Sequence, residues 1–198
     1  MENIIDLNKE ITFETFKQQV LEDYKIIVTS REASLLGRRE VLSGKAKFGI
    51  FGDGKELPQI ALAKVFQKGD FRSGYYRDQT FMMAINELTV KQIFSGLYAN
   101  TDIDEEPMSA GRQMGAHFNT PLLNNDGSWK KSIEYKNSSS DISCTGSQMP
   151  RLLGLAQASK LYRKLNFKNS KDFTKNGNEI AWGTIGNAST SEGVFFEV

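Results

Sequence analysis

The sequence has a single cysteine, Cys144, and a single histidine, His117, among its 198 residues. One cysteine excludes an internal disulfide and a cysteine-rich metal site. Because 25 basic residues balance 24 acidic ones, the net charge of +1 disfavours nucleic acid or an anionic membrane as the main partner. No apolar run approaches a membrane span, and the segment Met1–Asp6 lacks the pattern of a secretory signal. These absences predict a cytoplasmic protein of ordinary domain size.

Apolar residues recur at helical spacing in several segments. The spacing predicts helices over about residues 13–44, 56–67 and 90–97, and another that starts abruptly with Pro150 at its first position. Thr89 is the expected N-cap of the third helix. The first helix is long and amphipathic, so we expect it to pack through its apolar side. That side contains Phe13, Phe16, Val20, Tyr24, Ile27 and Val28.

Strand-like runs are few. The clearest is Ile180–Ile185, and Lys47–Phe51 and Phe71–Tyr75 are weaker candidates. A polar stretch over about residues 100–147 has no sustained period and is too long for an ordinary connection, so we expect a functional loop with a mobile middle, Asn124–Ser140. These patterns predict one α/β domain over residues 1–198, with a parallel sheet flanked by helices that is incomplete in this chain.

The segment that ends the chain is the most informative one. The apolar run Ile180–Ile185 leads into a polar loop of small residues from Gly186 and then into a helix start at Ser191-Glu192-Gly193. Such a loop lets backbone N–H groups approach phosphate oxygens, and the helix N-terminus adds partial positive charge. The pattern indicates a phosphate-binding loop, although α/β proteins also use glycine-rich turns for packing alone.

Three further motifs precede this loop. They are Gly74-Tyr75-Tyr76-Arg77-Asp78, Gly111-Arg112-Gln113-Met114-Gly115-Ala116-His117-Phe118 and Ser143-Cys144-Thr145-Gly146-Ser147-Gln148-Met149-Pro150. Together with residues 186–197, and in this order, they resemble the alpha part of the thiamine-diphosphate-dependent decarboxylating component of 2-oxoacid dehydrogenase complexes, of the branched-chain or pyruvate type. The resemblance covers about Tyr24–Val198. It implies a thiamine-diphosphate-binding, transketolase-like fold, while a transketolase itself lacks the second and third motifs.

The resemblance assigns Tyr76 and Arg77 to the cofactor diphosphate, a role that suits a guanidinium able to bind two oxygens at once. The alternative is a surface turn in which Arg77 forms an ion pair with Asp78. The resemblance also implies a cofactor loop that contains Asn187, Ala188 and Ser189. Asn187 stands where the family usually has the acidic ligand of Mg²⁺, and an amide oxygen is a weaker ligand for this cation.

The second motif contains His117, and the third motif contains the other implied site residues. In the family, the histidine at the position of His117 lies above the thiazolium ring and positions substrate or handles protons, work that suits a group titrating near neutrality. A solvent-exposed histidine is the alternative. Ser143 and Thr145 match positions that face the cofactor, and Ser147 and Gln148 match ligands of a potassium ion. The alternative here is a plain N-cap region for the helix that follows. No base lies beside Cys144 in sequence, which predicts a structural role.

These assignments predict a fragment of a 2-oxoacid dehydrogenase, truncated within the thiamine-binding motif and inactive alone. The family decarboxylates a 2-oxoacid on thiamine diphosphate with Mg²⁺ and passes the acyl group to a lipoyl domain; the 2-oxoacid itself stays open. The implied partner is the beta part, fused or separate, which supplies the glutamate that activates the cofactor, and an oligomer is expected. The alternative is a non-catalytic binding or assembly module that kept the fold. Asn187 and the missing second half of the thiamine motif favour this alternative.

Overall fold

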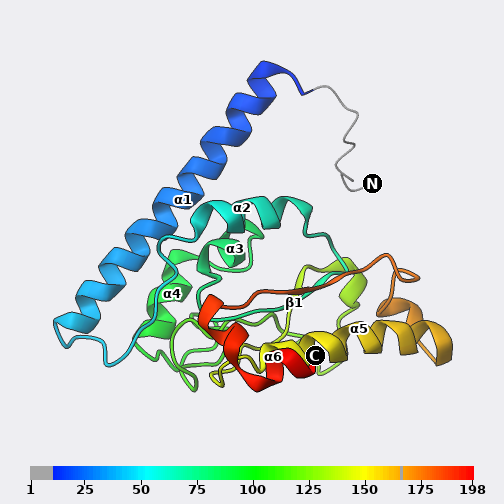
Figure 1. The fold of residues 1–198 in the computed structure, drawn as a ribbon. Helices are drawn as coiled ribbons and strands as arrows, with labels where there is room; N and C mark the ends of the chain where they lie inside the picture. The colour runs from blue at the N-terminus through cyan, green and yellow to red at the C-terminus, as the bar shows by residue number, and fades with distance from the viewer. Residues whose placement is uncertain (1–10, 166) are drawn as a thin grey trace.

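A computed structural model describes residues 11–165 and 167–198 as an α/β arrangement (Figure 1). The helices are α1 (Phe13–Leu42), α2 (Glu56–Val65), α3 (Gln79–Ala84), α4 (Val90–Leu97), α5 (Gln148–Leu165) and α6 (Gly193–Glu197). The strands are β1 (Phe71–Ser73), β2 (Asn137–Ser138) and β3 (Ala181–Gly183), and the 3₁₀ turns are η1 (Ser132–Glu134), η2 (Ser170–Asp172) and η3 (Asn187–Ser191). In the described part of the chain, no helix is both long enough and apolar enough to cross a bilayer.

The sheet is parallel, with strand order β2-β1-β3. Helices α2 and α3 lie on one side of it and α5 and α6 on the other (Figure 1). The predicted α/β class with a parallel sheet between helices is therefore confirmed. Phe71 pairs in register with Asn137 on one side and with Ala181 on the other, so all three strands end at the same edge of the sheet.

One strand prediction was wrong, and one strand was missed. Lys47–Phe51 forms no strand, because the Phe51 ring packs with Ala46 and Leu97 in a small cluster away from the sheet. Strand β2 was missed because it lies in the polar stretch and has no apolar period. Hydrogen bonds hold it instead: Asn137 donates its N–H to the Asp70 carbonyl at 3.1 Å, and Ser139 donates to the Arg72 carbonyl at 2.9 Å.

The four predicted helices are present as α1, α2, α4 and α5. Thr89 caps α4 with a reciprocal bond to Gln92, as the sequence indicated. Helix α5 begins at Gln148, two residues before Pro150, so this proline is not its first residue. Helix α3 was not predicted, because its six residues are too few to show a period.

Helix α1 packs through a different face from the one we expected. Its N-terminal half extends beyond the rest of the molecule (Figure 1), and the predicted apolar side is exposed there, with Phe13 73% exposed. The buried residues are the small ones Ser30, Ala33, Ser34 and Gly37. Small side chains allow close approach of neighbouring elements: a Cβ on Gly37 would lie 2.3 Å from the Phe51 ring. Close backbone approach, rather than apolar periodicity, therefore decides which face of α1 is buried.

The main core lies between the sheet and helices α2 and α3. Its buried members are Ala63, Phe66, Phe81, Met82, Ile85, Leu88 and Phe118. Phe66 and Phe81 meet edge to face with their ring centroids 5.1 Å apart, a geometry that aromatic quadrupoles favour. Phe118 follows His117 directly in sequence, so this core also fixes the end of the second motif.

The predicted long polar loop contains short ordered elements. A bridge joins Leu123 to Trp129, and η1 and β2 follow. Before them, the carboxylate of Glu106 accepts hydrogen bonds from the backbone N–H groups of Met108, Ser109 and Gly111 at 2.9–3.1 Å. The loop is thus shaped by side-chain-to-backbone bonds, which a period-based prediction cannot detect.

Candidate functional site

Each strand of the sheet ends in one of the motifs found in the sequence. Strand β1 leads into residues 74–78, β2 into residues 139–147, and β3 into residues 184–191. The loops also adjoin one another: an added Cβ on Gly186 would lie 3.6 Å from the Tyr75 ring, and one on Gly146 would lie 2.9 Å from Val194. Ligands of parallel α/β sheets bind outside the carboxyl ends of the strands, so this edge is the candidate site.

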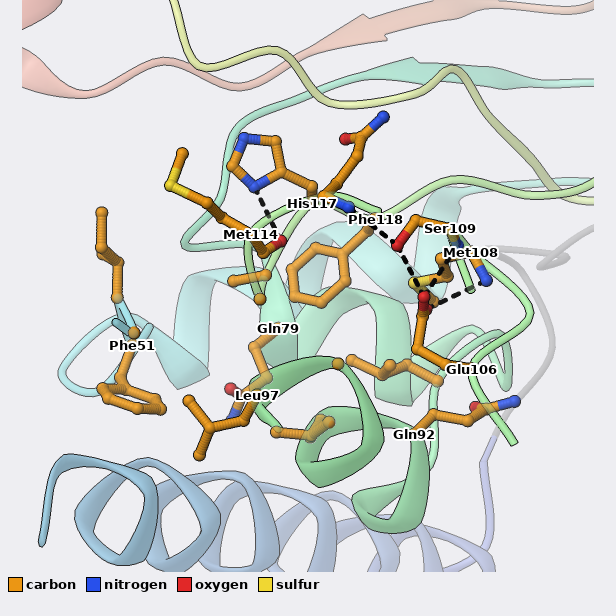
Figure 2. Close-up of a pocket in the computed structure, with 18 residues that line it drawn as sticks. Phe51, Gln79, Gln92, Leu97, Glu106, Met108, Ser109, Met114, His117 and Phe118 are labelled. Carbon is orange, nitrogen blue, oxygen red and sulfur yellow. Dashed lines mark hydrogen bonds between the residues drawn. The ribbon is translucent and has the colours of Figure 1, made fainter. Parts of the chain in front are cut away.

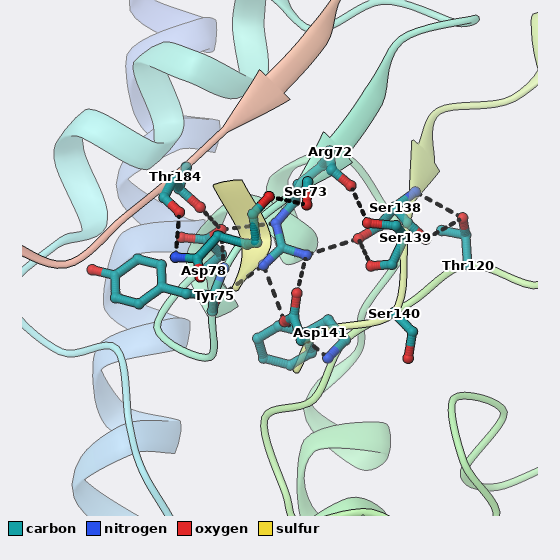
Figure 3. Close-up of polar contacts among 12 residues, drawn as sticks. Arg72, Ser73, Tyr75, Asp78, Thr120, Ser138, Ser139, Ser140, Asp141 and Thr184 are labelled. Atoms are coloured by element: carbon teal, nitrogen blue, oxygen red, sulfur yellow. Dashed lines mark hydrogen bonds and ion pairs between the residues drawn. The ribbon is translucent and has the colours of Figure 1, made fainter. Parts of the chain in front are cut away.

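A buried arginine lies at the centre of this edge (Figure 3). Arg72 is 1% exposed, and its Nε donates to Asp78 Oδ2 at 2.8 Å. Its two terminal nitrogens donate to the two oxygens of Asp141 at 3.0 and 3.1 Å. They also donate to Ser138 Oγ at 2.7 Å and to the Tyr75 carbonyl at 3.0 Å. All five N–H donors of the guanidinium are therefore used. We call Arg72, Asp78 and Asp141 the Arg72 ion cluster.

Burial and the attraction between opposite charges shift the pKa values of these groups in opposite directions. Burial lowers the pKa of Arg72, but attraction from Asp141 and Asp78 outweighs burial and raises the pKa above its ordinary value. Burial raises the pKa of Asp141; attraction from Arg72 opposes that rise only in part, and repulsion from Asp78 adds to it. One guanidinium thus compensates two buried carboxylates incompletely.

The ion cluster bonds to the first and second motifs and to Thr184, which leads into the final loop. Asp78 Oδ2 accepts from the N–H of Tyr75 at 3.4 Å and from the hydroxyl of Thr184. Asp141 Oδ2 accepts from the N–H of Phe118 at 3.2 Å. The third motif and the final segment are joined directly as well, because Gln148 Nε2 donates to the Thr184 carbonyl at 3.1 Å.

Gly74 is required by the close approach of these groups. A Cβ at this position would lie 2.2 Å from Arg72 Nε and 2.3 Å from Asp78 Oδ2. Any other residue would therefore displace the ion pair between Arg72 and Asp78.

Arg77 lies at the same edge, and no carboxylate among the described residues pairs with it. Its Nη1 donates to the Phe51 carbonyl at 2.6 Å, and its guanidinium lies over the Tyr76 ring, 5.5 Å from the centroid. The alternative ion pair with Asp78 is not formed, because Asp78 pairs with Arg72 instead. Within residues 11–165 and 167–198 no ion pair involving Arg77 is found. Its remaining N–H donors suit an anionic ligand such as a diphosphate.

His117 is 8% exposed, so the alternative of a solvent-exposed histidine does not hold. Its Nδ1 lies 3.1 Å from the Met114 carbonyl, and its Nε2 lies 2.7 Å from Ser143 Oγ. Because a carbonyl only accepts, Nδ1 carries a hydrogen, and in the neutral tautomer that this fixes, Nε2 is the acceptor for the Ser143 hydroxyl. The structure therefore brings together two residues from different motifs that the sequence assigned to one site.

The pocket behind His117 is mostly apolar (Figure 2). Its wall includes Phe51, Leu88, Ile93, Leu97, Met108 and Phe118. Gln79, Gln92 and Glu106 supply polar groups at its edge. The second motif meets α4 beside this pocket, because an added Cβ on Gly115 would lie 3.4 Å from Leu97 Cα.

The other implied residues lie around the same edge. Ser143, Cys144 and Thr145 are exposed, whereas Gln148 is buried at the start of α5. Ser147 donates its N–H to the Cys144 carbonyl at 3.1 Å, and Gly146 has a φ of +78°, which forms a tight turn before the helix. In the described ranges, no three His, Cys, Asp or Glu side chains converge as metal ligands. Any cation here would need carbonyl, hydroxyl or amide oxygens.

The final loop has the predicted order of strand, loop and helix. Asn187, Ala188 and Ser189 lie in η3, and α6 starts at Gly193. Asn187 and Ala188 are exposed, and Ser189 donates its N–H to the Gly186 carbonyl at 3.0 Å. The loop backbone is therefore accessible at the sheet edge where Arg77 lies.

Sequence reasoning missed Arg72, Asp78 and Asp141 as site residues. The available signal was the position of Arg72 inside the strand-like run Phe71–Tyr75, since a charge within a covered strand requires buried partners. The partners themselves could not be identified, because Asp141 is 69 positions away in the chain.

The family model of the dehydrogenase E1 component matches residues 25–198. This match includes all four motifs and most of the chain, so the chain belongs to the dehydrogenase E1 component family, and the resemblance to its alpha part is confirmed. The family depends on thiamine diphosphate and acts on 2-oxoacids. Comparison with curated proteins gave no match.

Proposed function

We propose that this chain is the alpha part of a dehydrogenase that decarboxylates a 2-oxoacid on thiamine diphosphate and passes the acyl group to a lipoyl domain. The observation that carries the proposal is that the loops after all three strands meet the second motif at the carboxyl edge of the parallel sheet, where no carboxylate of the described residues pairs with Arg77. This is the arrangement in which α/β sheets bind phosphorylated ligands.

In this proposal, Arg77 and Tyr76 bind the cofactor diphosphate, and the backbone of Asn187, Ala188 and Ser189 contacts it from the other side. Ser143 and Thr145 face the cofactor ring. When bound, thiamine diphosphate stabilises the carbanion that decarboxylation leaves behind. The protein contributes orientation and fixed donors.

His117 is the proposed catalytic residue of this chain. Its Nδ1 hydrogen is held by the Met114 carbonyl, so Nε2 is the atom that exchanges protons or positions the 2-oxoacid. Ser143 Oγ holds Nε2 in the absence of substrate. We expect this hydrogen bond to break or to be shared when substrate arrives.

Two cations belong to the proposal. Mg²⁺ would bind the amide oxygen of Asn187 together with the diphosphate, and K⁺ would bind oxygens of Ser147 and Gln148. Gln148 supports this role because its NH₂ group donates to the Thr184 carbonyl, which leaves its amide oxygen as the acceptor that could face a cation.

A complete site requires a partner. The beta part, fused or separate, supplies the glutamate that activates the cofactor, and the lipoyl domain of the acyltransferase component receives the acyl group. We expect an oligomer that contains both parts and a cytoplasmic location. The branched-chain type of 2-oxoacid is one candidate substrate class.

Turnover of 2-oxoacids tests this function directly. We expect CO₂ release from a branched-chain 2-oxoacid or pyruvate when the full-length protein is supplied with its beta part, thiamine diphosphate and Mg²⁺, and none from this chain alone. Failure of the assembled protein to decarboxylate any of these acids would contradict the proposal.

The second candidate is a non-catalytic assembly module, favoured by Asn187 in place of an acidic metal ligand. Such a module needs no cofactor, so calorimetry with thiamine diphosphate and Mg²⁺ distinguishes the two. Saturable binding supports the enzyme, and its absence supports the module.

A further inference from the structure

We propose that the Arg72 ion cluster is a positioning device that sets the relative placement of the cofactor-binding loops, so that Asp78 and Asp141 determine cofactor affinity through Arg77 and Ser143. The inference rests on the proposed function for the identity of the cofactor. None of the three residues belongs to the set that the sequence assigned to the site.

Asp78 couples the first motif to the final loop. It follows Arg77 directly, and its Oδ2 accepts from Arg72 Nε, from the Tyr75 N–H and from the Thr184 hydroxyl. Thr184 lies three residues before Asn187. A single carboxylate oxygen therefore fixes both sides of the proposed diphosphate site, and a shift of Asp78 would move Arg77 relative to the Asn187 loop.

Asp141 couples the second motif to the third. Its oxygens accept from both terminal nitrogens of Arg72, and Oδ2 also accepts from the Phe118 N–H. Asp141 lies two residues before Ser143, and Phe118 follows His117. The 2.7 Å contact between His117 Nε2 and Ser143 Oγ thus closes a ring that passes through Asp141.

Stability alone does not explain such a cluster. Moving charges out of water is costly, and apolar residues of similar size often replace buried ion pairs without loss of stability. What the charges add is directional geometry, because the five donors of Arg72 are matched by acceptors on four residues in two segments of the chain, residues 75–78 and 138–141. Precise loop placement is needed where a ligand must be held to within a fraction of an ångström.

The test compares two buried aspartates on either side of β1, in the full-length protein assembled with its beta part. Asp78→Asn perturbs the ion cluster at the carboxyl edge. Asp70→Asn is the matched control: Asp70 is equally buried and accepts from Ile180 N–H and Trp182 Nε1, both at 2.8 Å, at the opposite end of β1. Thr184→Val is a milder variant that removes only the hydroxyl bond to Asp78.

We expect Asp78→Asn to raise the dissociation constant of thiamine diphosphate about tenfold or more in calorimetry, and Asp70→Asn to change it by less than about twofold, although both lower the melting temperature. Thr184→Val should raise the dissociation constant about threefold. This variant tests the inference even if Asp78→Asn fails to fold. In the Arg77→Ala background, Asp78→Asn should weaken binding less than it does alone, because the part of its effect that passes through Arg77 is already lost.

Hydrogen exchange of the cofactor-free protein provides a second measurement. Asp78→Asn should speed exchange in residues 74–77 and 184–189 together, while Asp70→Asn leaves both segments unchanged. Equal affinity losses in Asp78→Asn and Asp70→Asn, or additive losses with Arg77→Ala, would overturn the positioning role. Absence of thiamine diphosphate binding by the unaltered protein would overturn the proposed function and this inference with it, a result distinct from binding that survives Asp78→Asn.

Discussion

Replacing Arg77 by alanine is the most direct perturbation of the proposed diphosphate site. Nη1 is already committed to the Phe51 carbonyl at 2.6 Å, which leaves the other terminal nitrogen and Nε available to phosphate oxygens. A hydrogen bond to a charged group contributes about 1.5–3 kcal/mol. We therefore expect Arg77→Ala to weaken thiamine diphosphate binding by about 2 kcal/mol, which is roughly a 30-fold increase in the dissociation constant.

Two controls separate lost binding from lost structure. Arg77→Lys keeps the charge but not the planar fork, so it should restore only part of the affinity. Arg38→Ala removes one positive charge from the neighbouring α1, where Arg38 pairs with Asp53 at 2.7 Å, and should leave affinity within about twofold of the unaltered protein because exposed ion pairs contribute little.

Calorimetric titration with thiamine diphosphate at saturating Mg²⁺ is the assay, in the full-length protein. The melting temperature of each variant is measured alongside, since Arg77→Ala also leaves the Phe51 carbonyl without its donor. An affinity for Arg77→Ala equal to that of the unaltered protein would refute the reasoning and remove Arg77 from the site.

Three further predictions follow from other parts of the structure. Asn187→Asp should lower the Mg²⁺ concentration for half-maximal thiamine diphosphate binding, because a carboxylate is a better ligand; an unchanged midpoint would count against Asn187 as a ligand. Bonds from Arg31 lower the pKa of Glu56 from 4.5 to about 2, so its contribution to stability is complete above pH 4.5 and is lost as the pH falls toward 2; Glu56→Gln should flatten the acid side of the thermal stability profile. Phe81→Ala, at a fully buried ring, should lower the free energy of unfolding by about 3–5 kcal/mol in urea titrations, and a loss below about 1 kcal/mol would contradict its place in the core.

Local signals were sufficient to predict the elements that depend on local chemistry. Neighbouring residues determine the Thr89 cap, the length of α1 and the run that becomes β3. The order of the motifs identified the family, which the match over residues 25–198 confirms. Strand β2 and helix α3 were missed because neither is long enough to show a period.

The face of α1 that is buried shows a different kind of failure. Periodicity located the apolar side through Phe13, Phe16 and Val20, yet the packed side contains Ser30, Ser34 and Gly37. Gln79 donates to Ser30 and Ser34 hydroxyls at 3.1 Å, so polar complementarity joins α1 to α3. A pattern of hydrophobicity contains no information about such contacts, which depend on the partner's residues.

The dependence of contacts on distant partners also explains which site residues could be predicted from the sequence. Residues that would touch the ligand, such as Arg77 and Asn187, lie in short motifs because each loop follows a strand and presents adjacent side chains to one edge. Residues that hold the loops together lie on β1 or follow one of the three strands, and most of their partners are distant in sequence. Arg72 reaches Asp141 across the gap between β1 and the loop after β2, and Asp78 reaches Thr184 after β3. Parallel strand order places these partners at one edge, so the topology that creates the ligand site also creates the buried charges that align it.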